Sequence, residues 1–403
     1  MEINRSILET IKYALTQTKV VLLTGPRQVG KSYIMQNFLN GFQYITFDTE
    51  NDLLLAKQDK NLFFTDKNYP LIIDEAQYVP EIFIKIKEIV DKSSTKGQII
   101  LTGSQSYELM DNATDSLAGR ISILELLPLS MREIFNINDN NPFIPNDIYI
   151  KNKNTHKYKD LWFYIHRGFF PELYDDKNRN TEWFYNDYIR TYLERDLTKI
   201  INVKDQITFR NFLISIAVRS GQIIIYEDIA KDLQISSVTV KNWVSILAAT
   251  GLIRIVHSYQ NNYLNRVIKA PKIYMLDTGL MCYLSGWKTK ESAENGASNG
   301  AIFETFIYNE IAKSFVNARK NLNDIYYYRD KEKNEIDFII EDDNNIYAIE
   351  VKKSATINEH WADEFKILNK IKNKKIIKKI VICQVDKIYN ISNDTIAMPL
   401  NYI

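Results

Sequence analysis

The sequence predicts an α/β protein in which an N-terminal parallel sheet is followed by a helical middle part and a second α/β unit. Short apolar runs alternate with helical patterns near the N-terminus, as in a parallel sheet covered by helices. The middle part shows short helices that end in an apolar strand pair. The C-terminal part begins with a helix and then turns to strands.

The chain length predicts several domains, because 403 residues exceed what one core usually serves and a domain averages roughly 150 residues. Irregular stretches at Asn136–Asp147 and Glu294–Gly300 suggest where the parts separate. We expect four segments: a sheet core in 1–140, a helical lid or connector in 141–203, a helix-turn-helix unit in 204–290 and a C-terminal α/β unit in 291–403.

Composition and charge narrow the possible functions. Hydrophobic residues make up 45% of the chain, and Cys282 and Cys383 sit among apolar neighbours, so we expect packed cores without disulfides. The net charge of +1 gives nucleic-acid binding no general support, so such binding has to rest on local sites. No apolar run is long enough to span a bilayer and no signal-peptide pattern is visible, so we expect a cytoplasmic protein without a membrane partner.

A glycine-rich loop carries the clearest motif. The run Val20–Leu23 predicts a buried strand, and a helix is expected from Lys31. Between them, Gly25, Gly30, Lys31 and Ser32 match the complete Walker A spacing. Glycines let backbone N–H groups surround phosphate, the lysine reaches the outer phosphates and the serine offers a hydroxyl to Mg²⁺. The motif therefore predicts binding of ATP with Mg²⁺.

Further polar groups follow two other predicted strands. Asp74 and Glu75 end the apolar run Leu71–Ile73, and the carboxyl ends of parallel strands are where ligands sit. We expect Asp74 to join the Mg²⁺ shell and Glu75 to orient the attacking water. The strand that ends at Thr102 is followed by Ser104, which we expect near the γ-phosphate. A fourth strand is expected at Tyr44–Phe47.

Arg120 has two interpretations. It can serve as an arginine finger in a neighbouring copy, which would require a homo-oligomer, or it is an ordinary surface arginine. Further signature-like segments are Ala118–Arg120, Leu127–Ser130, Gly168–Glu172, Leu193–Leu197 and Lys272–Leu280. Together these segments resemble a family of AAA-superfamily ATPases of bacteria and archaea that are fused to a C-terminal domain of unknown function.

The middle part resembles a winged helix. A helix at Tyr226–Leu233, a short turn and a second helix at Ser237–Thr250 fit a helix-turn-helix. Its small core would consist of Ile229, Leu233, Ile235, Val240, Val244 and Leu247. The start of the second helix would expose Thr239, Lys241 and Asn242 to DNA, although many such units dock proteins instead.

The C-terminal part contains a carboxylate constellation. Strand alternation puts Glu350 and Lys352 on one face, and an adjacent antiparallel strand can bring Asp337 beside them. Two carboxylates that hold Mg²⁺ beside a lysine suit phosphodiester hydrolysis. The arrangement resembles the restriction-endonuclease-like PD-(D/E)XK core, although Ile336 stands where proline is often found. By this resemblance, Glu304 takes the place of the upstream helical carboxylate.

The sequence leaves two main hypotheses for function. In the first, ATP hydrolysis is coupled to DNA binding or metal-dependent DNA cleavage. In the second, the protein is an ATP-driven switch whose winged helix and inactive nuclease-like unit dock protein or DNA without cleavage. A nucleotide kinase is disfavoured because no acceptor-site signature is visible.

Overall fold

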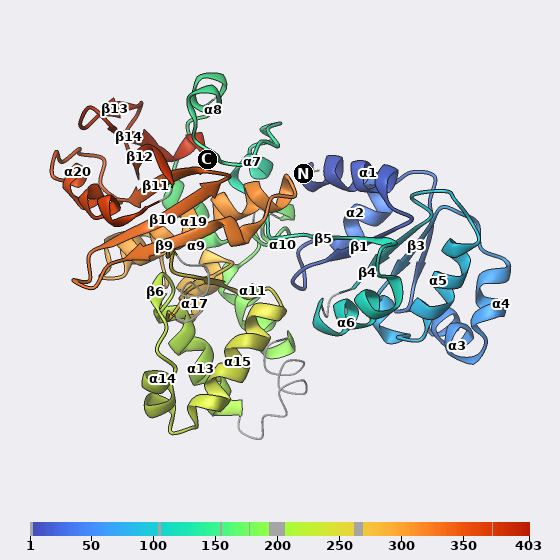
Figure 1. Ribbon diagram of the computed structural model, residues 1–403. Helices are drawn as coiled ribbons and strands as arrows, with labels where there is room; N and C mark the ends of the chain where they lie inside the picture. The colour runs from blue at the N-terminus through green and yellow to red at the C-terminus, as the bar shows by residue number, and fades with distance from the viewer. Residues whose placement is uncertain are drawn as a thin grey trace.

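Figure 1 shows the computed structural model, which describes residues 3–403 apart from 104–105, 154, 177, 193–205, 262–268 and 373. The N-terminal parallel sheet lies on one side of the molecule and the C-terminal sheet on the other. The helices of the middle part lie below the C-terminal sheet. Among the described helices, none is long and apolar enough to cross a membrane.

The N-terminal sheet has five parallel strands in the order β2-β3-β4-β1-β5. Their bounds are β1 Val20–Thr24, β2 Gln43–Thr46, β3 Leu71–Asp74, β4 Ile99–Thr102 and β5 Ile121–Glu125. The four predicted strands are confirmed to within a residue. The sequence did not indicate β5, because its run Ile-Ser-Ile-Leu-Glu is interrupted by polar residues; half-buried and buried positions alternate along this edge strand. Since β4 lies between β1 and β3, three strand ends meet at the glycine-rich loop.

Helices cover both faces of this sheet. Successive residues of β1 point to opposite faces, so Val21 and Leu23 join one hydrophobic cluster while Val20 and Leu22 join another. The first face is covered by α1 (Ile7–Gln17) and α2 (Lys31–Phe38), and the second by α4 (Lys60–Thr65), α5 (Ile82–Asp91) and α6 (Ser106–Leu117). The helix α3 (Glu50–Gln58) precedes α4.

Short helices connect the sheet to the middle part. They are α7 (Met131–Ile134), α8 (Asp147–Asn152), α9 (Leu161–Arg167), α10 (Glu172–Asp175) and α11 (Thr181–Tyr188). The middle part then runs through α13 (Gln206–Val218), β6 (Gln222–Ile223), α14 (Tyr226–Leu233), α15 (Ser237–Ala249), β7 (Ile253–Val256) and β8 (Lys272–Met275). Its three strands form an antiparallel sheet in the order β6-β8-β7.

The predicted helix pair is confirmed in α14 and α15. Ser236 caps α15 by accepting a hydrogen bond from the Thr239 backbone N–H at 3.0 Å. Of the expected core, Ile229, Val240, Val244 and Leu247 are buried, whereas Leu233 and Ile235 are half-buried. Lys241 and Asn242 are exposed and Thr239 is half-buried.

The C-terminal part consists of a long helix and a mixed sheet. Its strands lie in the order β13-β14-β12-β11-β10-β9, with antiparallel pairing from β9 to β11 and parallel pairing from β11 to β14. The elements are α17 (Thr278–Leu284), α18 (Lys290–Asn295), α19 (Asn299–Asn317), β9 (Ile325–Arg329), β10 (Glu335–Asp342), β11 (Asn345–Val351), α20 (Trp361–Glu364), β12 (Lys375–Cys383), β13 (Tyr389–Asn390) and β14 (Thr395–Pro399).

The stretch Glu294–Gly300, expected as a linker, is instead a tight joint between α18 and α19. A Cβ on Gly296 would lie 2.3 Å from the Trp287 ring, so the chain packs closely here. Gly296 permits this close approach because it lacks a side chain.

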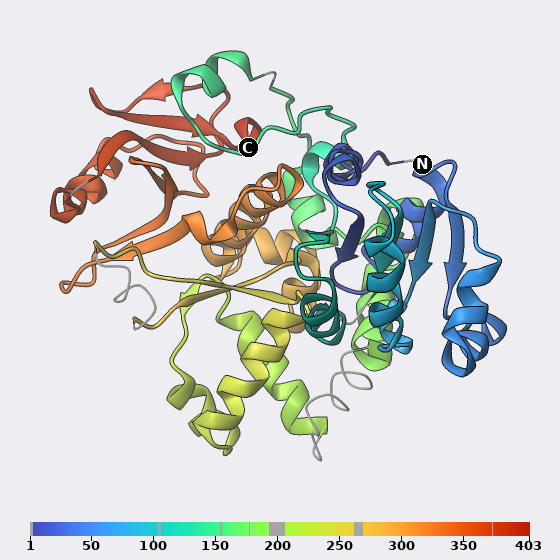
Figure 2. The same ribbon diagram turned by 45° about the vertical axis from the view of Figure 1, so that its right-hand side comes forward.

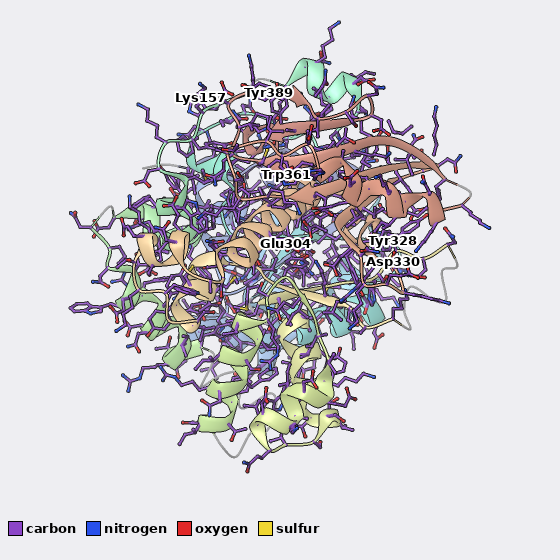
Figure 3. All side chains as sticks on the ribbon, turned by 90° about the vertical axis from the view of Figure 1, so that its left-hand side faces the viewer. Lys157, Glu304, Tyr328, Asp330, Trp361 and Tyr389 are labelled. Carbon is purple, nitrogen blue, oxygen red and sulfur yellow. The ribbon has the colours of Figure 1, made fainter. Side chains whose placement is uncertain are left out.

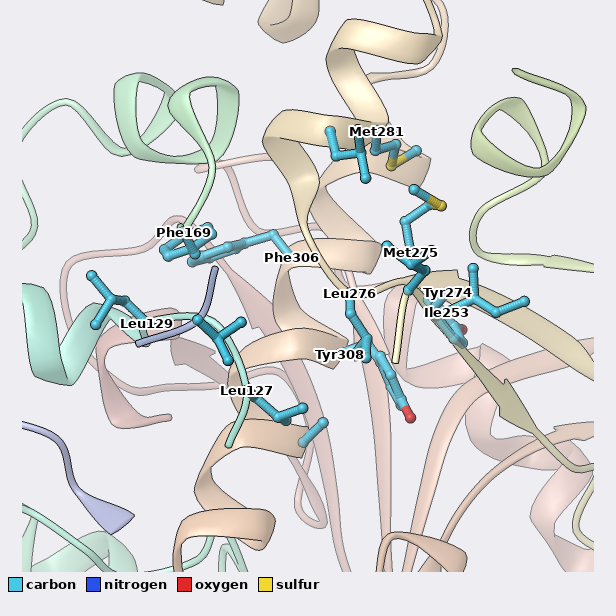
Figure 4. Packing of buried hydrophobic residues seen from close by; sticks show 14 of the residues in the cluster. Leu127, Leu129, Phe169, Ile253, Tyr274, Met275, Leu276, Met281, Phe306 and Tyr308 are labelled. Carbon is cyan, nitrogen blue, oxygen red and sulfur yellow. The ribbon is translucent and has the colours of Figure 1, made fainter. Parts of the chain in front are cut away.

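The parts share one hydrophobic core. Figure 4 shows Leu127 and Leu129, which follow β5, close to side chains from α19 and the middle part. Phe169 stacks on Phe306 at 5.9 Å between ring centroids. In Figure 2, α19 lies between the C-terminal sheet and the N-terminal part. The relative positions of the parts are therefore fixed by buried apolar contacts as well as by chain connection.

A buried arginine ties the glycine-rich loop to the segment that leaves β5. Arg5 is 6% exposed, and it donates to the carbonyls of Val29 at 2.7 Å and Leu127 at 2.6 Å. It also pairs with Glu133 at 3.1 Å. The other carboxylate oxygen of Glu133 accepts from the Ser130 backbone N–H at 2.8 Å, which completes a capping box.

We expect Arg5→Met to lower the free energy of unfolding by about 3 kcal/mol or more, because it leaves Glu133 as a buried charge without its ion-pair partner. Chemical denaturation of the full chain would measure the loss. Lys12→Met, which breaks an exposed pair with Glu9, is the matched control and should leave the unfolding midpoint unchanged. Equal effects of the two substitutions would contradict the role given to Arg5.

Candidate functional site

The glycine-rich loop curls between β1 and α2 in a shape that only glycine permits at two positions. Gly25 has a φ of +142°, and a Cβ there would lie 2.2 Å from the Leu126 carbonyl oxygen. Gly30 has a φ of +93° and precedes the first residue of α2. Its left-handed conformation turns the loop into the helix, whose free N–H groups favour an anion.

Lys31 is the first residue of α2 and is 5% exposed. Its ammonium donates to the carbonyls of Gly25 at 3.0 Å and Pro26 at 2.7 Å, so it is held inside its own loop. Burial lowers the pKa of Lys31 to about 8, although the Glu75 and Asp74 carboxylates act in the opposite direction. An incoming phosphate would supply the negative charge that this buried ammonium lacks.

Ser32 and Asp74, which are expected to hold Mg²⁺, both contact Tyr44. The sequence indicated no role for this tyrosine at the site. Tyr44, from β2, donates its hydroxyl to Asp74 at 2.6 Å and shares a side-chain hydrogen bond with Ser32. Asp74 is 2% exposed, and its other oxygen accepts from the Glu75 backbone N–H at 3.1 Å. A hydroxyl and a carboxylate thus converge on one point, and hard oxygen ligands of this kind fit Mg²⁺.

Glu75 lies beside Asp74 in a strained conformation. Its φ of +56° places a non-glycine residue in the left-handed region, which costs conformational energy. Gln77 donates its side-chain amide to the Glu75 carboxylate. A Cβ on Gly103, at the end of β4, would lie 2.2 Å from the Gln77 amide oxygen, so this glycine makes room for the glutamine. Ser104 lies outside the described residues.

A pocket of about 610 Å³ opens over the loop. Its lining includes Lys31, Ser32 and Glu75, together with Arg27 of the same loop and Tyr192. The Arg27 guanidinium lies 5.0 Å from the centre of the Tyr192 ring. Cationic and aromatic groups at one rim are suited to a nucleotide, which carries both phosphate and a base.

Arg120 lies away from this pocket. It immediately precedes β5, at the amino edge of the sheet, whereas the glycine-rich loop is at the carboxyl edge. Its guanidinium pairs with Asp91. The structure does not bring Arg120 to the loop of its own chain. It could act as an arginine finger only at the nucleotide site of a neighbouring copy.

The middle part contacts the glycine-rich loop directly. A Cβ on Gly251 would lie 2.8 Å from the Pro26 ring, so the turn before β7 rests against the loop. Arg254 of β7 pairs with Glu125, at the carboxyl end of β5. Glu125 is the register partner of Thr24, which directly precedes Gly25. A change in the conformation of the loop can therefore affect the middle part through two contacts, Gly251 with Pro26 and Arg254 with Glu125.

The structure brings the predicted C-terminal carboxylates together. Strands β10 and β11 are antiparallel neighbours, and Asp337 accepts a hydrogen bond from the Val351 backbone N–H at 2.8 Å. Lys352 donates to Glu350 at 3.2 Å and to Glu364 at 2.8 Å. Burial, together with the Glu304 charge, raises the pKa of Asp337 to about 7. Burial and the Asp337 charge raise the pKa of Glu350 well above its usual range.

Glu304 contacts Lys272, for which the sequence indicated no role beyond its place in the segment Lys272–Leu280. Lys272, from β8 of the middle part, donates to Glu304 at 3.0 Å and pairs with Glu335 at 2.6 Å. Tyr274 also donates its hydroxyl to Glu304 at 2.6 Å. In the part of the chain that the structure describes, no group of three His, Cys, Asp or Glu residues is arranged to hold a metal ion. The Mg²⁺ site expected at Asp337 and Glu350 stays a prediction, and the buried Lys272 ammonium lies 3.9 Å from Asp337.

Comparison with protein-family models divides the chain into three matches. Residues 17–135 match a model described as an AAA domain. The N-terminal part of the chain is thus an ATPase-like P-loop domain of AAA type. Such a domain supports ATP binding and hydrolysis. Residues 158–291 and 299–403 match two domains of unknown function, DUF8612 and DUF4143.

Similar proteins occur in bacteria and archaea. The chain is 28% identical over 353 residues to the uncharacterized protein Rv2008c of Mycobacterium tuberculosis, covering 87% of this chain and 74% of the relative. It is 27% identical over 360 residues to the uncharacterized protein MJ1544 of Methanocaldococcus jannaschii, covering 83% and 75%. A solved structure, the Walker-type ATPase PABY2304 of Pyrococcus abyssi, aligns with a TM-score of 0.38 and 14% identity over 69% of this chain and 94% of that one.

We expect Tyr44→Phe to raise the Mg²⁺ concentration needed for half-maximal ATP hydrolysis by about tenfold, because Asp74 loses the hydroxyl that orients it. Affinity for ATP without metal should not change. Tyr69→Phe, which alters a partly exposed tyrosine before β3, is the control. An unchanged Mg²⁺ dependence would show that the hydroxyl does not position Asp74.

The lowered pKa of Lys31 predicts that ATP affinity falls with rising pH. The empty site begins to lose the ammonium proton above a pH of about 8, and binding phosphate requires that proton back. The dissociation constant should therefore rise by up to about tenfold per pH unit above this point. Fluorescent-nucleotide titrations would measure this change. Lys31→Arg should show no such rise because its guanidinium stays charged, and a flat profile in both proteins would contradict the prediction.

Proposed function

We propose that this protein hydrolyses ATP and uses the nucleotide state to control how its middle and C-terminal parts engage DNA. The observation that carries the proposal is the direct packing of Gly251 against Pro26 of the phosphate loop. Lys31 would bind the outer phosphates, and Ser32 and Asp74 would hold Mg²⁺, which neutralises phosphate charge when bound. Glu75 would orient the attacking water.

The middle part supports DNA as the partner. Its order of helices and strands, α13-β6-α14-α15-β7-β8, is compatible with a winged helix. The exposed Lys241 and Asn242 at the start of α15 suit contacts with phosphates or base edges. A protein partner is the alternative, since this helix presents only one lysine there.

The C-terminal part would act in binding rather than cutting. The order α19-β9-β10-β11-α20-β12 is compatible with a nuclease-like core, and Asp337 lies near Glu350 as such a core requires. The buried Lys272 among these carboxylates favours a unit that does not cleave. Metal-dependent cleavage remains the competing function, because Lys352 and the two carboxylates are of the right type.

The test is ATP hydrolysis by the full chain with and without duplex, branched and single-stranded DNA. We expect DNA to stimulate hydrolysis, and Lys31→Ala to reduce it by about 100-fold or more, because the outer phosphates lose their cation. Lys96→Ala, an exposed lysine before β4, is the control. Glu75→Gln should still bind ATP but hydrolyse it far more slowly.

Arg254→Met tests the coupling itself. Because Arg254 links β7 to Glu125 without lining the nucleotide pocket, we expect normal basal hydrolysis but reduced stimulation by DNA. If hydrolysis depends on Lys31 but no DNA stimulates it, a protein rather than DNA would be the partner. Hydrolysis unaffected by Lys31→Ala would overturn the proposal altogether.

A further inference from the structure

A lysine is buried among the carboxylates of the C-terminal part. The Lys272 side chain is 3% exposed, and its ammonium lies 3.0 Å from Glu304, 2.6 Å from Glu335 and 3.9 Å from Asp337. The carboxylates come from α19 and β10, whereas the lysine comes from β8 of the middle part. Figure 3 places Glu304 between the C-terminal strands above it and the helices of the middle part below.

Lys272 is firmly held in this position. Its strand is the centre of the three-stranded sheet and packs on α19, where Tyr274 stacks on Tyr308 at 4.3 Å between ring centroids. The Asn309 side-chain amide donates to the Met275 carbonyl at 3.0 Å. The hydroxyl groups of Ser220 and Thr305 form a buried hydrogen bond at 2.9 Å. Moving the lysine would therefore require breaking a buried polar and aromatic interface.

The other charged groups of the cluster also have partners, except that Glu350 Oε1 is buried and accepts no hydrogen bond from a described residue. Lys352 bridges Glu350 and Glu364, and the Val351 backbone N–H occupies one oxygen of Asp337. The Tyr274 hydroxyl occupies the same Glu304 oxygen as Lys272. The buried Lys272 and the half-buried Lys352 thus supply positive charge to these carboxylates.

We propose that the Lys272 ammonium is the resident cation of this cluster, so that the folded chain takes no divalent metal at Asp337 and Glu304. A divalent ion binds carboxylate oxygens at roughly 2.0 to 2.6 Å. It would then lie within a few ångströms of a buried ammonium, and like charges at that separation repel strongly. The ion pairs of the cluster hold the middle part and the C-terminal part together, so the role of the cluster is structural rather than catalytic.

The test is Mn²⁺ binding to the nucleotide-free full chain. Binding is measured from the decrease in the electron paramagnetic resonance signal of free Mn²⁺. Wild type and Asp337→Asn should bind Mn²⁺ equally, because the wild-type cluster holds none. Lys272→Met should gain about one site per chain, since the carboxylates then lack their cation. That site should be lost again in the Lys272→Met/Asp337→Asn double variant.

Two controls separate charge from structure. Lys272→Arg keeps the positive charge and should not gain a site, and Lys269→Met removes an exposed lysine three positions earlier and should behave as wild type. Binding in wild type that depends on Asp337 would overturn the proposal, as would a folded Lys272→Met protein without the extra site. If Lys272→Met fails to fold, the comparison of wild type with Asp337→Asn decides the matter alone. None of these measurements depends on ATP hydrolysis or on DNA.

Discussion

The arrangement of the molecule depends on the Arg5 guanidinium, which holds three separate segments at one buried point. It joins the phosphate loop at Val29, the chain leaving β5 at Leu127 and the cap of α7 at Glu133. A buried arginine has to be paired or it destabilises the fold, so these segments cannot shift independently. The phosphate loop is therefore linked to the segment between β5 and α7, where the connector begins.

From that point, the same pattern of buried polar contacts continues into the C-terminal part. The Met131 backbone N–H donates to Glu310 at 2.8 Å, and Lys313 donates to the Leu129 carbonyl at 2.7 Å. Both side chains come from α19, which also carries Glu304 toward Lys272. One helix thus contacts the exit from the P-loop domain and the carboxylate cluster, which gives the two sites a common rigid element.

The sequence predicted what is local and periodic. Four of the five strands of the N-terminal sheet, the helix pair at Tyr226–Ala249 and the proximity of Asp337 to Glu350 follow from burial patterns and strand alternation. The residue roles at the nucleotide site stay predictions. What the sequence could not indicate are contacts between distant positions: Arg5 and Glu133 lie 128 positions apart, and Lys272 lies 32 positions from Glu304. A charged residue in an apolar run, such as Lys272 before Ile273, was the one available signal that a buried partner exists.

The shared core limits how such a protein can be taken apart. A fragment ending near residue 140 would keep Leu127 and Leu129 but lose the aromatic side chains that cover them, and the Leu129 carbonyl would lose Lys313. A chimera that exchanged the C-terminal part would have to bring a matching α19 with its own Glu310 and Lys313. Exchange of one part without its contacting residues should therefore destabilise the others, even though each part has a recognisable fold pattern of its own.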